Sequence, residues 1–238
     1  MTDNSKAPEE RLHQVQQQIG QALEQSQRPV DATALLAVSK TRPASDILAL
    51  YRLGQRRFGE NYLQEALEKI AQLDNYDIEW HFIGPIQSNK TRDITSHFSW
   101  VHSVDRLKIA RRLSEQRPEG LPALNICLQV NLSGEASKSG CSLEELPQLA
   151  TEVAKLPRLK LRGLMAIPAP SNNFETQRRP FQALREAMDQ LRADGLSLDT
   201  LSMGMSGDLA AAITEGATLV RIGTALFGPR VPKTDALP

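Results

Sequence analysis

The chain has 238 residues, 40% of them hydrophobic and 24% charged, and its 28 basic and 28 acidic side chains cancel. This composition is typical of a globular protein and excludes a disordered, fibrous or membrane-spanning one, while the balanced charge excludes a general attraction to nucleic acid or to an anionic membrane. The polar first residues lack the apolar stretch of a secretory signal, so we expect a cytoplasmic location.

Short apolar runs alternate with longer amphipathic segments along most of the chain. A leading helix is predicted over residues 8–27, and eight strands follow at Ala34–Lys40, Arg56–Asn61, Ile78–Gly84, Trp100–Val104, Leu124–Leu132, Leu159–Ile167, Thr200–Met205 and Leu219–Phe227. Helices between the strands indicate an α/β fold, a single closed (β/α)8 barrel of the TIM type, with an open doubly wound sheet as the alternative. We expect residues 1–30 to form the leading helix, 31–230 the barrel and 231–238 a tail.

Two of the predicted helices carry clear end signals. The helix Leu143–Leu156 has Ser142 as its candidate N-cap and tolerates Pro147 in its first turn. The helix Phe174–Ala193 is long and charged along one side, and Gly195 supplies its stop.

The cysteines and histidines form no metal-binding pattern. Cys127 and Cys141 lack the CxxC spacing. The histidines are scattered without an HExxH motif, at positions His13, His81, His97 and His102. We interpret them as packed or surface residues and predict neither a metal site nor a disulfide scaffold.

The first predicted strand runs directly into a lysine. Lys40 stands at the carboxyl end of this strand, where the working face of a β/α barrel lies. An amine that is desolvated or close to another cation has a lowered pKa and can attack an aldehyde to form a Schiff base. A solvated lysine at the end of a strand is the alternative.

The loops after the seventh and eighth strands are where such barrels commonly bind phosphate. The seventh strand ends in Ser202-Met203-Gly204-Met205-Ser206-Gly207-Asp208, and a helix is predicted at Leu209–Glu215. Glycines let backbone amides approach an anion, and Ser206 adds a hydroxyl. The alternative is an ordinary turn in which Ser206 or Asp208 caps the helix.

Arg221 lies in the apolar eighth strand. A buried guanidinium needs a partner, which is either a ligand or a carboxylate of the barrel. Because the first and eighth strands of a closed barrel are neighbours, one ligand can contact Lys40, the loop around Ser206, and Arg221. Pyridoxal 5'-phosphate (PLP) has an aldehyde, a phosphate and a ring nitrogen to match these three groups.

Seven motifs occur in order: Ala37-Val38-Ser39-Lys40, Phe58-Gly59-Glu60-Asn61-Tyr62, Trp80-His81-Phe82-Ile83-Gly84 with Gln87-Ser88-Asn89-Lys90, Lys138-Ser139-Gly140, Arg162-Gly163-Leu164-Met165, Ser202-Met203-Gly204-Met205-Ser206 and Val220-Arg221-Ile222-Gly223-Thr224. Over nearly the whole chain they resemble the pyridoxal-phosphate homeostasis protein family, whose fold is similar to the barrel domain of alanine racemase. The resemblance implies a barrel of PLP fold type III.

The resemblance also implies a role for each site residue. Lys40 would carry PLP covalently, and Arg221 would face the pyridine nitrogen. Asn61 would lie near the ring or its hydroxyl, and the phosphate would be held by Ser206, Gly207, Gly223 and Thr224. Met165 and Ser202 would complete the cofactor site. Gly207, where many relatives carry Asp or Ala, and the tail Pro229–Pro238 depart from the family pattern without removing an assigned side chain.

The resemblance implies a protein that carries or buffers PLP in intracellular vitamin B6 and amino-acid homeostasis, with no established reaction. We expect its recipients to be PLP-dependent apo-enzymes, which the sequence does not identify, and we take a monomer as the default. The alternative is an amino-acid racemase of the alanine racemase type, which needs a base on each face of the cofactor. Alanine racemase takes its second base from a tyrosine of another domain, whereas this chain ends just after the barrel. Tyr51, Tyr62 and Tyr76 lie in or beside predicted helices, and Tyr62 is the candidate worth testing.

Arg221 favours the carrier over the racemase. An arginine next to the pyridine nitrogen disfavours protonation there, which weakens the ring as an electron sink. A phosphate-sugar barrel enzyme is a third hypothesis, but it gives Lys40 no aldehyde to attack. The basic residues 90–92 and 106–112 are either a docking or second ligand surface or, more simply, solvated helix faces.

Overall fold

Eight parallel strands close into a barrel in the order β1 to β8 in the computed structural model, which describes residues 7–133 and 139–229. The barrel closes because β1 pairs with both β2 and β8. The strands are β1 (Ala34–Val38), β2 (Arg57–Glu60), β3 (Glu79–Phe82), β4 (Trp100–Val104), β5 (Leu124–Gln129), β6 (Leu159–Met165), β7 (Thr200–Ser202) and β8 (Leu219–Ile222). The predicted barrel is confirmed, and the open sheet is wrong.

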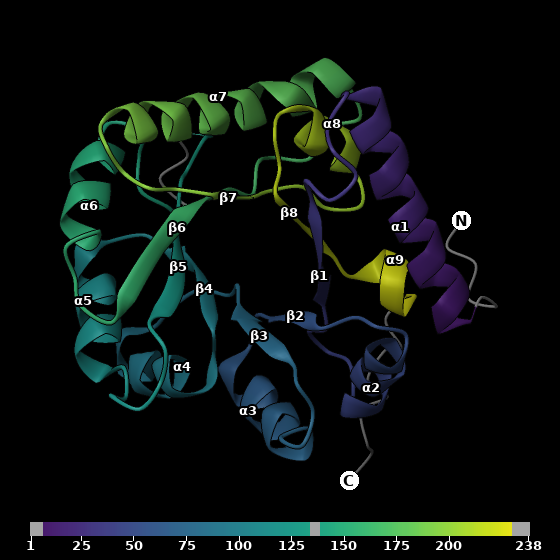
Figure 1. The fold of residues 1–238 in the computed structure, drawn as a ribbon, viewed down its shortest axis with the longest axis horizontal. Coiled ribbons are helices and arrows are strands. Elements are labelled where there is room, and N and C mark those ends of the chain that lie inside the picture. The colour runs from purple at the N-terminus through teal and green to yellow at the C-terminus, as the bar shows by residue number, and fades with distance from the viewer. Residues whose placement is uncertain (1–6, 134–138, 230–238) are drawn as a thin grey trace, which may run out of the picture.

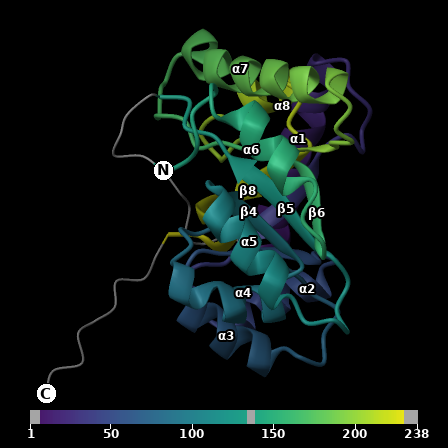
Figure 2. The same ribbon diagram turned by 90° about the vertical axis from the view of Figure 1, so that its left-hand side faces the viewer.

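The helices form a ring around the strands (Figure 1) and flank them again in the view turned by 90° (Figure 2). They are α1 (Pro8–Gln25), α2 (Ala44–Arg52), α3 (Leu63–Gln72), α4 (Thr91–His97), α5 (Leu107–Gln116), α6 (Leu146–Val153), α7 (Phe174–Ala193), α8 (Leu209–Thr214) and α9 (Thr224–Phe227), with a short 3-10 helix, η1, at Ser88–Lys90. Among the described residues, none of these helices combines the length and the apolar character needed to cross a membrane.

The leading helix α1 packs beside α8 and α9, the last two helices of the chain order (Figure 1). Its buried face repeats every three or four residues, as an amphipathic helix requires, and contains Leu12, Val15, Ile19, Ala22 and Leu23. Arg11 of α1 donates from Nε to the carbonyl of Leu226 at 2.7 Å, and Arg28, in the segment after α1, donates from Nη1 to the carbonyl of Ile213 at 2.7 Å. Residues 1–6 and the predicted tail at 231–238 lie outside the described residues, so the domain boundaries stay a prediction.

The helix α7 has the predicted bounds. Asn173 is its N-cap, and the Asn173 side chain accepts a hydrogen bond from the Thr176 amide at 2.9 Å. The helix α6, in contrast, begins three residues after the predicted Leu143, with Pro147 in its first turn. Ser142 still accepts from the Glu145 amide at 3.1 Å, but it closes a turn that precedes the helix.

The predicted eighth strand, Leu219–Phe227, is too long. β8 ends at Ile222 because Gly223 leaves the extended region, with φ −114° and ψ −82°, and its carbonyl accepts hydrogen bonds from the amides of Leu226 and Phe227. The seventh strand likewise ends early, at Ser202, because Gly204 has a φ of +95°.

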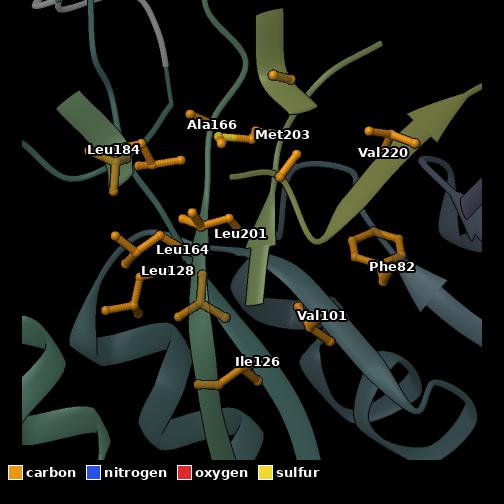
Figure 3. Close-up of a cluster of buried hydrophobic side chains, with 14 of the residues drawn as sticks. Phe82, Val101, Ile126, Leu128, Leu164, Ala166, Leu184, Leu201, Met203 and Val220 are labelled. Atoms are coloured by element: carbon orange, nitrogen blue, oxygen red, sulfur yellow. The ribbon is translucent and has the colours of Figure 1, made fainter. Parts of the chain in front are cut away.

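The main hydrophobic core lies between the strands and the helices, and part of it is drawn in Figure 3, including Phe82, Val101, Leu164, Leu184 and Met203. A separate apolar cluster joins the alternate residues Leu36 and Val38 of β1 to Ile83 and Leu219. A third consists of Trp100, Cys127 and Met165. Strand side chains therefore divide into an outward set, which packs under the helices, and an inward set, which fills the barrel.

Candidate functional site at the carboxyl end of the barrel

Lys40 follows β1 at the carboxyl end of the barrel. Leu36 and Val38 belong to the inward cluster, and Ser39 still pairs with β2, since its amide donates to the carbonyl of Gly59 at 2.9 Å. The alternation of the strand therefore brings Lys40 to the inward side, and Lys40 is half-buried. This is the position that the sequence predicts for a lysine of the barrel mouth.

A buried ion pair lies behind Lys40, on the outer side of β1 and β2. Lys69 Nζ donates to the Ser39 carbonyl and to Glu60 Oε1, each at 2.8 Å, and the Ser39 hydroxyl donates to the same carboxylate at 2.6 Å. Burial raises the pKa of Glu60, while the positive charge of Lys69 opposes the shift. The pair fixes the residue before Lys40, and the sequence reasoning did not find it because Lys69 lies on a helix, nine positions from its partner.

The turn after Lys40 is tied to the end of the last β/α unit. Thr41 adopts a φ of +63°, and its amide donates to Glu65 Oε1 at 2.5 Å. Arg42 donates to the carbonyl of Gly228, and its guanidinium lies 5.9 Å from the ring centre of Phe227. The loop that carries Lys40 is thus held against the loop after β8.

The predicted phosphate site consists of two adjacent loops. Ser206 and Gly207 are exposed in the loop between β7 and α8, and Gly223 and Thr224 begin α9. Within the described part of the chain, the amides of Ser206, Gly207 and Gly223 donate to no acceptor. A Cβ at Gly223 would lie 3.3 Å from the Val38 carbonyl oxygen, so this loop touches β1 two residues before Lys40.

Asp208 does not cap α8 through its side chain. Its carboxylate accepts from the Met205 amide at 2.6 Å and so folds the loop back on itself. Burial raises the pKa of Asp208, with Arg221 among the groups that oppose the shift. The loop is therefore shaped by Asp208, while the amides of Ser206 and Gly207 stay available to an anion.

Arg221 is buried inside the barrel, with 4% of its surface exposed. Its Nη1 donates to the Ser202 hydroxyl at 2.9 Å, and its Nη2 donates to the Ala166 carbonyl at 2.9 Å. No described carboxylate forms a salt bridge with Arg221, so the ion-pair alternative from the sequence finds no partner in this part of the chain. Burial lowers the pKa of Arg221 to about 10, so the guanidinium stays charged at neutral pH.

Two buried histidines extend this network. His102 Nδ1 lies 2.7 Å from the Ser202 hydroxyl oxygen, and His102 Nε2 lies 2.9 Å from His81 Nδ1. Burial lowers the pKa of both imidazoles. The sequence reasoning treated them as ordinary packed residues. His81 follows Glu79 by two residues on β3, and His102 follows Trp100 by two residues on β4. These equivalent positions on consecutive strands are the sequence signal that predicts a contact between the two histidines.

Asn61 and Met165 differ in what they offer a ligand. Asn61 Oδ1 is buried and accepts no hydrogen bond from the described residues. Met165 is fully buried against Trp100 and Cys127, and Ser202 is committed to Arg221 and His102. The structure thus brings Lys40, Asn61, Arg221 and the two loops to one end, with Met165 and Ser202 beneath them.

The remaining candidates from the sequence show no metal-binding or catalytic arrangement among the described residues. The cysteines are free, and burial raises the pKa of Cys127 to about 12 and of Cys141 to about 11. No group of three potential metal ligands occurs among residues 7–133 and 139–229. Tyr62, the candidate base, is 54% exposed before α3. Lys138 lies outside the described residues.

Comparison with known proteins places this chain in a family. Residues 11–231 match the family model described as alanine racemase, N-terminal domain. The pyridoxal phosphate homeostasis protein of Pseudomonas aeruginosa is 61% identical over 221 residues, which cover 93% of this chain and 95% of the relative. The protein of the same name from Escherichia coli is 51% identical, over 92% of this chain and 95% of the relative. The chain belongs to the pyridoxal phosphate homeostasis protein family.

Solved structures of this family have the same fold. PipY of Synechococcus elongatus with PLP bound superposes with a TM-score of 0.81 at 36% identity, covering 93% of this chain and all of that one. Its PLP-free form gives a TM-score of 0.83 at 38% identity, with the same coverage. Alanine racemase of Corynebacterium glutamicum shares the fold alone, with a TM-score of 0.65 at 18% identity, and the match covers 91% of this chain and 60% of the racemase.

Proposed function

We propose that the protein binds PLP as a Schiff base on Lys40 and carries or buffers it in vitamin B6 and amino-acid homeostasis. The observation that carries the proposal is that an amine, a buried guanidinium and three amides without acceptors among the described residues converge. The guanidinium lies on β8, and the amine and the amides lie in the segments that follow the neighbouring strands β1, β7 and β8. The name of the curated relatives and the PLP-bound form of PipY agree with it.

The residues fit the cofactor group by group. PLP supplies an aldehyde for Lys40 to attack, and its phosphate would accept from the amides of Ser206, Gly207 and Gly223, with Thr224 adding a hydroxyl. The unpaired Asn61 Oδ1 would accept a hydrogen bond from the cofactor. Arg221 would face the ring nitrogen, with Met165 and Ser202 below it.

Arg221 also supports the carrier over the racemase. Its guanidinium stays charged at neutral pH, and a positive charge beside the pyridine nitrogen opposes protonation there. The ring would then accept electrons poorly, so proton abstraction from a bound amino acid would be weakly promoted. Tyr62, 54% exposed, offers no fixed second base.

The site is tested by its visible spectrum. We expect an absorption band from bound PLP in the purified protein, loss of the band in Lys40→Ala, and a borohydride-reduced adduct on Lys40 by mass spectrometry. Lys90→Ala, at an exposed lysine of η1, serves as the control and should keep the band. A band that persists in Lys40→Ala, or an adduct on another lysine, would show that Lys40 is a solvated strand-end residue.

We further propose that the protein is a cytoplasmic monomer whose recipients are PLP-dependent apo-enzymes. Mixing the loaded protein with an apo-enzyme should restore activity of the apo-enzyme, and Lys40→Ala loaded under the same conditions should not. The mass in solution, measured by light scattering, should be that of one chain. If free PLP, released from the protein beforehand, reactivated the apo-enzyme as well as the loaded protein does, the protein would only buffer PLP. A Lys40-dependent turnover of an amino acid would argue for the racemase.

A further inference from the structure

A chain of hydrogen bonds crosses the barrel from one end to the other. It runs from Arg221 to Ser202 at 2.9 Å, from Ser202 to His102 at 2.7 Å, from His102 to His81 at 2.9 Å, and from His81 Nε2 to Glu79 Oε1 at 2.9 Å. His102 lies on β4 and Ser202 on β7, which are not neighbours in the barrel. The bond between them therefore spans the interior.

The groups at the two ends of this hydrogen-bond chain determine which atom of each pair donates, beginning with Arg221. A guanidinium only donates, so the Ser202 oxygen accepts from Arg221, and the acceptor that the described residues offer to the Ser202 proton is His102 Nδ1. His102 then carries its proton on Nε2 and donates it to His81 Nδ1. His81 carries its own proton on Nε2 and donates it to Glu79.

The Glu79 end requires the same direction. A carboxylate only accepts, so the facing nitrogen of His81 must carry a proton. If the direction were reversed with neutral imidazoles, His81 Nε2 would present a lone pair to Glu79, and the Ser202 proton would lose its acceptor among the described residues. Burial lowers the pKa of both imidazoles and favours their neutral forms. For neutral rings, the two ends of the chain require the proton of each ring to be on Nε2.

Glu79 opens this chain to the amino-terminal mouth of the barrel. Its side chain is 38% exposed and pairs with Arg57 at 3.1 Å. A cavity of about 270 Å³ at this mouth is lined by Glu79, His81, Arg162 and Asp199, among others. The other groups facing the imidazoles are the Trp100 ring, stacked on His81 at 5.3 Å with Arg162 over it at 4.6 Å, and the Arg221 charge next to His102.

We propose that Glu79, His81 and His102 are positioning residues, which hold Arg221 through Ser202 in one fixed hydrogen-bond direction beneath the cofactor ring. The consequence for PLP depends on the proposed function, whereas the direction of the chain does not. With its proton committed to His102, the Ser202 oxygen keeps a lone pair toward Arg221. Breaking the chain at Glu79 removes the acceptor that orients both imidazoles, so the hydroxyl can turn and Arg221 loses a partner.

The direction is tested without cofactor, by nitrogen NMR of 15N-histidine-labelled protein in which PLP has been removed. His81 and His102 are assigned with the variants His81→Asn and His102→Asn. Both should be neutral at pH 7 with the proton on Nε2. A proton on Nδ1 of either ring, or an imidazolium, would overturn the proposal whether or not PLP binds.

The effect on the cofactor site is tested by titrating the visible band of bound PLP with pH. Glu79→Ala, which removes the last acceptor, should move the midpoint by about half a pH unit or more, since a displaced buried charge shifts a neighbouring equilibrium on this scale. Glu79→Gln keeps an acceptor oxygen and should restore most of the wild-type midpoint. Asp199→Ala is the matched control, because it removes a carboxylate that pairs with Arg162 at the same mouth but is outside the chain.

The outcomes separate the two proposals. Equal midpoints in Glu79→Ala and Asp199→Ala, with the band still dependent on Lys40, would overturn the positioning role and leave PLP binding intact. Equal shifts in Glu79→Ala and Glu79→Gln would assign the effect to lost charge and also overturn it. Absence of any band would refute PLP binding, and the NMR result would still decide the direction of the chain.

Discussion

At the scale of the residue, the structure shows hydrogen-bonded partners for side chains that the sequence predicts one at a time. The sequence predicts Lys40 as one amine at the end of a strand, and the structure adds the ion pair of Lys69 and Glu60 that fixes the residue before it. Likewise the sequence predicts one partner for Arg221, and the structure shows a chain of partners behind it. Burying these polar groups costs free energy unless each is hydrogen-bonded, which explains why they occur in connected sets.

The two buried histidines predict how stability depends on pH. In the unfolded chain each imidazole binds a proton below its ordinary pKa of 6.5, whereas in the folded protein burial lowers both pKa values and the rings stay neutral. The free energy of unfolding is therefore insensitive to these two histidines above pH 6.5. It decreases as the pH falls below 6.5, by up to about 1.4 kcal/mol per pH unit for each histidine. Urea unfolding at several pH values measures this slope.

The variant His102→Gln should have a shallower slope than the wild type, because it removes one of the two groups. His97→Gln, at an exposed position of α4, should keep the wild-type slope. If the two variants had the same slope as each other, the acid loss would come from other groups.

At the scale of the element, positions with special backbone geometry decide where strands end. Gly204 ends the seventh strand with a φ of +95°, and a Cβ there would lie 2.5 Å from the Ala212 Cβ. A Cβ at Gly207, three residues later in the same loop, would meet no heavy atom within 4 Å beyond its chain neighbours. The structure therefore requires a glycine at Gly204, whereas it leaves room for a side chain at Gly207.

We expect Gly204→Ala to lower the free energy of unfolding by about 1–3 kcal/mol, since the added methyl group meets α8 and the residue must keep a left-handed conformation. Gly207→Ala should change the free energy of unfolding by less than about 0.5 kcal/mol. Thermal and urea unfolding of both variants provide the measurement. A similar loss in both would mean that the loop tolerates no side chain at all.

At the scale of the whole molecule, the sequence predicts the barrel, which the structure confirms, and it predicts a site at the carboxyl end of the strands. Eight alternating units determine the topology, and closure makes the first and eighth strands neighbours, so Lys40 and Arg221 could be brought together before any coordinates. The ends of the strands and the hydrogen-bond chain through His81 and His102 could not be predicted from the sequence. They depend on φ values at Gly204 and Gly223 and on contacts between β4 and β7, which are far apart in sequence and leave no local periodicity.

The attachment of α1 has a consequence for how the protein is made. This helix is synthesised before α8 and α9, yet its apolar face packs against them, and Arg11 contacts Leu226, 215 positions later. The first strand likewise awaits β8 to complete its pairing. Such distant contacts form late and slowly, so the nascent chain exposes an amphipathic helix and an open barrel edge until α8, β8 and α9 have been synthesised. We therefore expect newly synthesised chains to need protection from aggregation during that interval.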